Sequence, residues 1–140
     1  DQKIADIKDY QKSNIYENIG KEHKNIIIVN QDKDIEEILK NKVKERKITY
    51  SYLLDGNDLI DRIKSKREYD YIIIGDELKG INGISILREL QKLEDFKTPI
   101  IIIVDKNKEN LAKHYLEQGF DNYILYSNFE EDLNKVLDTY

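Results

Sequence analysis

Cysteine is absent from this sequence of 140 residues, and only two histidines are present. The missing cysteines exclude disulfides, thiolate nucleophiles and cysteine-ligated zinc, and two histidines are too few for an ordinary histidine-rich metal site. The longest apolar run, residues 99–104, is far shorter than the roughly 20 residues of a membrane-spanning helix. No basic and apolar leader precedes a small-residue cleavage site. We therefore expect a cytoplasmic protein that does not enter a membrane.

Basic residues are in the minority: 23 Lys and Arg stand against 28 Asp and Glu, which gives a net charge of -5. This acidic balance argues against nucleic-acid binding by this domain alone. The mean hydropathy of -0.70 is low for a folded protein, but the apolar residues gather in isoleucine-rich blocks, which favours a core over disorder. The length corresponds to one domain. Because the sequence begins at Asp1 without a Met, we expect it to be a piece of a longer protein.

Residues 1–24 differ from the rest of the sequence. Their isoleucines stand at roughly helical spacing among charged and amide residues, and Gly20 is a plausible stop signal. This pattern predicts an N-terminal helical extension or linker that leads into a domain formed by residues 25–140.

From residue 25 onward, short apolar or β-branched blocks alternate with amphipathic stretches. The blocks predict strands at residues 26–29, 48–52, 71–74, 99–104 and 123–126. The stretches between and after them predict five helices, around residues 35–43, 59–63, 84–90, 109–118 and 130–137. This alternation predicts an α/β fold, a three-layer sandwich with helices on both faces of a five-stranded parallel sheet. Ligands of such sheets bind at the carboxyl ends of the strands, so a site is expected there.

Five short motifs follow one another along residues 25–140. They are Ile26–Val29, Tyr69–Ile74, Lys79–Gly83, Thr98–Ile101 and Gly119–Tyr123. In this order and at this spacing they resemble the receiver domain of two-component response regulators. The resemblance implies a CheY-like, flavodoxin-like fold and a signal transduction module of a two-component (phosphorelay) system. It also implies a histidine kinase or an output domain as partner.

The chemical positions of that family carry other residues here. Counting back from Gly83, the position of the phosphorylated aspartate falls on Gly75. Asn30 and Gln31 stand in place of the acidic pair that would hold Mg²⁺. Val104 replaces the hydroxyl residue that ends the fourth strand, and Tyr126 replaces the lysine that ends the fifth. The resemblance therefore implies a degenerate phosphorylation pocket.

Loss of charge at these positions removes what phosphoryl transfer needs. Mg²⁺ takes one or two carboxylates as ligands, and two unit charges 4 Å apart interact by about 4 kcal/mol at an effective dielectric of ~20. Asn30 and Gln31 are uncharged, and Gly75 has no side chain to accept a phosphoryl group. Because this reaction depends on positioning and charge neutralisation, we expect no catalytic residue, no metal and no cofactor, and a module that acts without phosphorylation.

Two alternatives stay open at this stage. A loop one residue shorter would place Asp76 in the acceptor position, with Asp32 and Asp76 as metal ligands for Mg²⁺, although the spacing from Asp70 favours position 75. The second alternative is a small-ligand sensor, in which a pocket rimmed by Asn30, Gln31 and Gly75 binds a neutral or anionic molecule.

The resemblance also implies a protein-interaction face made by the fourth helix, the fifth strand and the fifth helix. The residues expected there are Tyr115, Gln118, Tyr123, Tyr126 and Phe129. Aromatic side chains commonly anchor interfaces, but these residues also suit the rim of a core. The N-terminal helix would join the domain to a kinase or an output module, or would pair in a homodimer.

Overall fold

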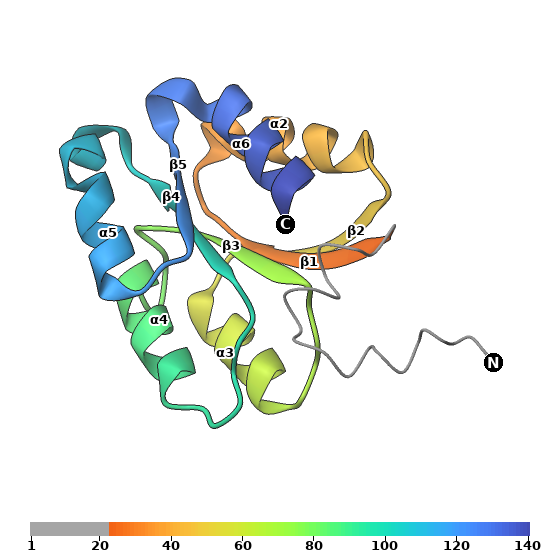
Figure 1. The fold of residues 1–140 in the computed structure, drawn as a ribbon, viewed down its shortest axis with the longest axis vertical. Coiled ribbons are helices and arrows are strands. Elements are labelled where there is room, and N and C mark those ends of the chain that lie inside the picture. Colours follow the sequence, from red (N-terminus) through yellow and green to blue (C-terminus); the bar gives the residue numbers. More distant parts are fainter. Residues whose placement is uncertain (1–22) are drawn as a thin grey trace.

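Five parallel strands form one sheet in the order β2-β1-β3-β4-β5 (Figure 1). The structure is a computed structural model, and it describes residues 23–140. The strands are β1 (Lys24–Val29), β2 (Ile48–Leu53), β3 (Tyr71–Gly75), β4 (Ile100–Val104) and β5 (Asn122–Leu125). The predicted five-stranded parallel sheet is confirmed. Of the expected N-terminal helix, residues 1–22 lie outside the described part, and Lys24 already belongs to β1.

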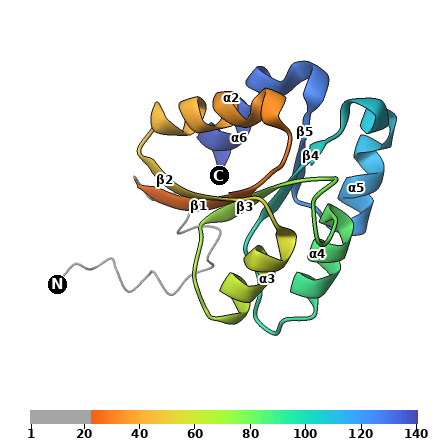
Figure 2. The ribbon, with the colours of Figure 1, turned by 180° about the vertical axis from the view of Figure 1, so that it is seen from behind.

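Helices cover both faces of the sheet (Figures 1 and 2). One face carries α2 (Lys33–Lys44) and α6 (Phe129–Thr139), and the other carries α3 (Gly56–Lys64), α4 (Gly83–Gln91) and α5 (Ala112–Gln118). Two 3₁₀ helices, η2 (Lys106–Leu111) and η3 (Tyr126–Asn128), precede α5 and α6. This is the predicted three-layer sandwich. No helix among residues 23–140 is long and apolar enough to cross a bilayer.

The isoleucine-rich strands divide one core into two layers. Successive side chains of a strand point to opposite faces, so Ile27 and Val29 pack under α3, α4 and α5, whereas Ile26 and Ile28 pack under α2 and α6. Every residue of β3 and β4 is buried. Complete burial of such a side chain contributes roughly 1.5–3 kcal/mol, so apolar runs without polar alternation suit these central strands.

The helices that follow β1, β2 and β3 each begin with a polar N-cap, α2 after three residues, α3 after two and α4 after a loop of seven. The side chains of Asp32, Asp55 and Asn82 accept hydrogen bonds from backbone N–H groups in the first turns of α2, α3 and α4. These caps satisfy helix-end donors that would otherwise lack partners. The carboxyl ends of the strands and the amino ends of these helices therefore lie at the same edge of the sheet.

Two aspartates fix the opposite edge. The Asp70 carboxylate accepts the N–H of Asn25 at 2.7 Å, and the Asp121 carboxylate accepts the N–H of Ile100 at 2.7 Å. Burial raises the pKa of Asp121. Each aspartate precedes one strand and bonds the start of the neighbouring strand, which helps to set the register of both pairs.

Two predicted boundaries are wrong near the C-terminus. The strand predicted at 123–126 ends at Leu125 and Tyr126 begins η3, because β4 ends at Val104 and the last residue pair is Val104 with Leu125. The helix predicted from Glu109 begins as an α-helix only at Ala112. Residues 106–111 form η2 instead, and the Asp105 side chain makes no capping hydrogen bond.

Candidate functional site

The ends of β1, β3 and β4 bring the predicted pocket positions to one edge of the sheet. Val29 pairs with Ile74, and Gly75 pairs with Ile103. The residue after Val29 therefore lies beside the last residue of β3.

Asn30 and Gly75 are neighbours on the face covered by α2 and α6. A Cβ atom built on Gly75 would lie 3.2 Å from Asn30 Oδ1. Asn30 is only 3% exposed. The structure thus brings together Asn30, at the position of a metal-binding acid, and Gly75, at the position of the phosphorylated aspartate. The Asn30 amide lies against the space that an acceptor side chain at position 75 would occupy.

The amide side chains of this pocket are bonded within the chain. Asn30 Nδ2 donates to the Tyr52 hydroxyl at 2.9 Å and to the Asp32 carbonyl at 3.1 Å. Gln31 Nε2 donates to the Leu54 carbonyl. Burial raises the pKa of Tyr52. Both protons of the Asn30 amide are used, so the amides tie β1 to β2 and the loop after it.

The pocket residues do not fit Mg²⁺, the ion that the receiver resemblance implies. Asn30, Gln31 and Gly75 supply no carboxylate, and a hard divalent cation takes charged oxygen ligands. The Asp32 carboxylate accepts the Asp34 N–H as the N-cap of α2. Within residues 23–140 no group of three or more His, Asp or Glu side chains could hold a metal ion.

The two remaining pocket positions, Val104 and Tyr126, lie in different surroundings. Val104 is fully buried in the core beneath α3, α4 and α5. The Tyr126 hydroxyl donates to Asp34 Oδ2 at 3.3 Å, and Lys106 Nζ lies 5.4 Å from the centre of its ring. Burial and the nearby Asp32 and Asp34 carboxylates raise the pKa of Tyr126. Tyr126 therefore connects η3 to the first turn of α2.

Asp76 points to the face opposite Gly75. The Tyr115 hydroxyl donates to Asp76 Oδ2 at 2.5 Å, and Lys108 Nζ lies 3.6 Å from the same oxygen. Asp76 is 7% exposed. Burial and the Asp76 carboxylate raise the pKa of Tyr115, and Glu77 and Asp76 raise the pKa of Lys108. The structure therefore joins Asp76 to α5 and η2, and not to Asn30 or Asp32.

The arrangement of strands, helices and pocket matches one family. The model of the response regulator receiver domain matches residues 26–138. The chain belongs to this family. Receiver domains are generally non-enzymatic signalling modules of two-component systems.

Solved structures show the same fold. The receiver domain of the Francisella response regulator 1452 is 25% identical, with a TM-score of 0.72 over 83% of this chain and 94% of that chain. A putative response regulator from Chloroflexus aurantiacus is 18% identical, with a TM-score of 0.73 over 82% and 94%. The receiver domain of a Pseudomonas aeruginosa sensor histidine kinase is 20% identical, with a TM-score of 0.69 over 82% and 94%. That last structure has a magnesium ion coordinated in its active-site cleft.

The expected interaction face of the receiver domain needs a correction. Tyr115 and Phe129 are 3% and 6% exposed, because each side chain points from its helix into the core. Gln118, Tyr123 and Tyr126 remain partly exposed.

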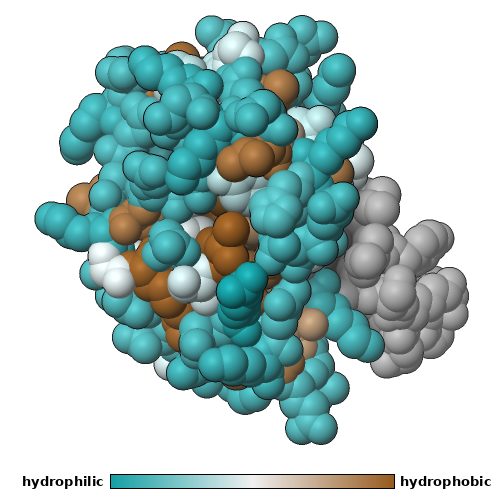
Figure 3. Space-filling model, turned by 90° about the vertical axis from the view of Figure 1, so that its left-hand side faces the viewer, coloured by the Kyte–Doolittle hydropathy of each residue, from teal (hydrophilic) through white to brown (hydrophobic). Residues whose placement is uncertain are grey.

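Two leucines on the same side of the receiver domain are exposed instead. Leu111 is 42% exposed and Leu116 is 40% exposed. Figure 3 shows small apolar areas on this side, surrounded by hydrophilic surface. In a helix over residues 109–118, as the sequence predicts, Leu111 and Leu116 would belong to the apolar face with Ala112 and Tyr115. The later start of α5 changes which residues face inward.

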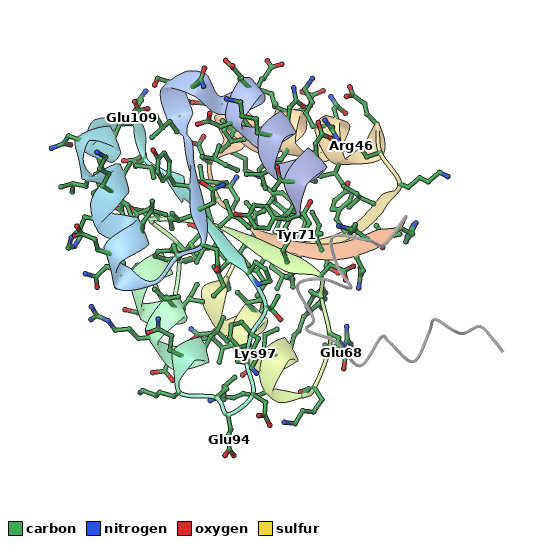
Figure 4. All side chains as sticks on the ribbon, viewed as in Figure 1. Arg46, Glu68, Tyr71, Glu94, Lys97 and Glu109 are labelled. Carbon is green, nitrogen blue, oxygen red and sulfur yellow. The ribbon has the colours of Figure 1, made fainter. Side chains whose placement is uncertain are left out.

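Sequence reasoning also missed several polar partners in the receiver domain. Lys108 lies in a polar run that has no periodicity, and its pairing with Asp76 depends on the path of η2. Glu109, which is labelled in Figure 4, accepts hydrogen bonds from the N–H and the hydroxyl of Ser127, both at 2.7 Å. No local sequence signal marks either contact, because the partners are far apart along the chain.

A shallow open groove of about 410 Å³ lies beside Tyr126, between α2 and the start of α6. Its lining includes the largely buried Ile35 and Phe129. Asp34 and Glu130 contribute carboxylates to the lining. This charge opposes the binding of an anion at the groove.

Proposed function

We propose that this receiver domain is a signalling module of a two-component system that acts through protein–protein interaction and without phosphorylation. The observation that carries the proposal is Gly75 at the acceptor position, with the Asn30 amide against the space where an acceptor side chain would lie. On this proposal the domain takes no Mg²⁺ and has no catalytic residue.

The hydrogen bonds of the pocket support this proposal. Asn30 and Gln31 each donate to groups of the chain itself, to Tyr52 and to the Leu54 carbonyl among them. A small ligand at the pocket would have to replace these bonds. The same bonds therefore weigh against the small-ligand sensor.

The surroundings of Asp76 weigh against a phosphoacceptor role for that residue. Its carboxylate is largely buried, accepts the Tyr115 hydroxyl and lies beside Lys108. Asn30 lies at the position of a metal-binding acid, and Asp32 is the other metal ligand that the alternative requires. Neither residue is among the partners of Asp76.

A partner would bind at the side formed by α5, β5 and α6. The partly exposed Gln118, Tyr123 and Tyr126 and the exposed Leu111 and Leu116 lie there. Exposed apolar side chains among polar ones suit an interface. We infer that the partner is a histidine kinase or an output domain, or a second copy of the chain. The cytoplasmic location stays a prediction.

The proposal is tested by an amide NMR titration with Mg²⁺ and beryllofluoride, a mimic of the aspartyl phosphate. The wild-type domain is compared with the triple variant Asn30→Asp, Gln31→Asp and Gly75→Asp. We expect no saturable shifts in the wild type and new shifts around residue 75 in the variant. A Cβ atom at position 75 would lie 3.2 Å from Asn30 Oδ1, so it requires the side chain at position 30 to shift by a few tenths of an ångström.

The variant serves as the positive control, because it restores the carboxylates to the same fold. Saturable beryllofluoride-dependent shifts in the wild type would overturn the proposal. If Asp76→Asn then abolished those shifts, the acceptor would be Asp76.

A further inference from the structure

The segment formed by η2 and α5, residues 106–118, has few of the features that stabilise a helix. α5 is seven residues long, no side chain caps its start, and it has no acidic residue in its first turn and no basic residue in its last. A helix this short is unstable alone in water. Ala112 and Tyr115 are the two buried residues of the segment. Contacts with the rest of the molecule therefore decide where the segment lies.

Polar contacts join the segment to three other parts of the molecule. After β3, Asp76 accepts the Tyr115 hydroxyl and lies near Lys108 Nζ, which also pairs with Glu77 at 3.1 Å. In η3, Ser127 donates to Glu109. From α4, Arg88 and Gln91 donate to the side chain and the carbonyl of Gln118. The contacts of Glu109 and Gln118 are exposed, and exposed polar contacts contribute little to stability. The hydrogen bond from Tyr115 to Asp76 is buried, so it is the strongest polar contact of the segment.

Asp76 belongs to a rigid part of the fold. Its carbonyl accepts the Gly83 N–H at 2.9 Å, which joins the end of β3 to the start of α4. A Cβ atom on Gly83 would lie 2.9 Å from the Gly75 carbonyl, so the two elements are in close contact there. The carboxylate is thus held in place, and the partners on η2 and α5 bond to it. Hydrogen bonds to an ionised group are roughly twice as strong as neutral ones.

We propose that Asp76 is a latch for residues 106–118. While Tyr115 and Lys108 contact its carboxylate, α5 is held on the sheet. When these contacts break, the segment opens locally as a unit, Tyr115 leaves the core, and the surface that carries Leu111 and Leu116 changes. The opening regulates the interaction side only if the proposed function holds, but the opening itself does not depend on that function.

Hydrogen exchange on the full chain tests the latch. The variant Tyr115→Phe removes only the hydroxyl and keeps the ring that packs against Phe120. We expect exchange of the amides of residues 106–118 to rise by about ten- to a hundredfold, the effect of losing a hydrogen bond to a charged group. In wild type and variant alike, the amides of β1 and β3 still exchange only through global unfolding, and therefore more slowly than those of residues 106–118.

The matched control is Tyr71→Phe, which removes a buried hydroxyl that has no hydrogen-bond partner among residues 23–140. It leaves exchange of residues 106–118 unchanged. A second pair compares Lys108→Ala, which speeds exchange of the segment, with the exposed Lys113→Ala, which does not.

Two results would overturn the latch. One is unchanged exchange of residues 106–118 in Tyr115→Phe, and the other is exchange of this segment at the same opening free energy as β1 and β3, which would show that it opens only when the whole chain unfolds. The beryllofluoride titration gives an independent readout. If the wild type bound beryllofluoride, the proposed function would be contradicted. If residues 106–118 nevertheless exchanged faster in Tyr115→Phe, the latch would still be supported.

Discussion

At the scale of single residues, two buried tyrosines differ in what their hydroxyl groups meet. The Tyr71 hydroxyl is buried between the sheet and the layer of α2 and α6 and has no partner among residues 23–140 (Figure 4). The Tyr115 hydroxyl donates to Asp76. A buried polar group without a partner costs roughly 1–3 kcal/mol. The ring of Tyr71 therefore stabilises the core, whereas its hydroxyl group destabilises it.

We expect Tyr71→Phe to raise the free energy of unfolding by about 1 kcal/mol, because the ring stays and a hydroxyl with no partner among residues 23–140 is removed. Tyr115→Phe is expected to lower it by roughly 1.5–3 kcal/mol, the range for hydrogen bonds to charged groups. Urea denaturation followed by circular dichroism measures both. A clear loss of stability in Tyr71→Phe would contradict the prediction.

The same two tyrosines predict how stability depends on alkaline pH. Burial raises the pKa of Tyr71 and of Tyr115 above the ordinary value of 10.0. A raised folded-state pKa leaves stability intact below the unfolded-state value and removes it as pH rises above that value. Above about pH 10 the free energy of unfolding should fall by roughly 1.4 kcal/mol per pH unit for each of them.

Denaturant unfolding at a series of pH values between about 9 and 11 checks this dependence. Tyr71→Phe and Tyr115→Phe should each make the decline shallower by the contribution of one group. The same slope in wild type and variants would show that these phenols ionise as easily in the fold as in the unfolded chain.

At the scale of elements, the contact between β3 and α4 leaves no room at Gly83. A Cβ atom there would lie 2.9 Å from both the Gly75 carbonyl oxygen and Ile102 Cδ1. At Gly75 the nearest atom to an added Cβ is the movable Asn30 Oδ1, at 3.2 Å. The two glycines are therefore present for different reasons.

Gly83→Ala is expected to cost roughly 1–3 kcal/mol of unfolding free energy, because backbone and core atoms have to shift. Gly75→Ala should cost less than about 1 kcal/mol, because one side chain can adjust. Thermal unfolding of the two variants beside the wild type gives the comparison. Equal losses would contradict the difference between the two glycines.

The order and type of the elements could be predicted from the sequence, because the isoleucine-rich blocks are continuous and N-cap residues such as Asp32 and Asp55 follow the strands. The end of β5 could not, because Tyr126 suits a strand as well as Leu125 does and the length of β4 decides where pairing stops. The start of α5 could not either, since no capping residue marks it.

The site was predictable only where backbone position alone decides it. Asn30 and Gly75 meet as expected, because both follow from strand ends and register. The direction of Asp76 follows from the alternation along β3, but its partners Lys108 and Tyr115 lie more than thirty residues further along the chain. Their positions depend on η2, which has no recognisable sequence pattern.

At the scale of the whole molecule, the central strands depend on contacts between distant segments. β1 pairs with β3 as well as with β2, and β3 pairs with β4, all in parallel. Parallel pairing requires long loops to close before the contacts form, which slows folding. The core is therefore complete only when most of the chain is in place.

The composition of β4 has a consequence for the chain before it folds. Pro99–Val104 exposes four consecutive isoleucines in the unfolded chain, and short β-prone segments of low charge self-associate. Lys97, Asp105 and Lys106 flank this run and act as charged gatekeepers against association.

The double variant Asp105→Asn and Lys106→Gln removes two of these charges. We expect its refolding yield from urea to fall more steeply with rising protein concentration than that of the wild type, while the stability of the folded monomer stays unchanged. If the yield of that variant did not depend on protein concentration, fast assembly of the sheet, and not the flanking charges, would protect the unfolded chain from association. The same isoleucines that stabilise the native sheet thus limit the concentration at which this protein can be produced.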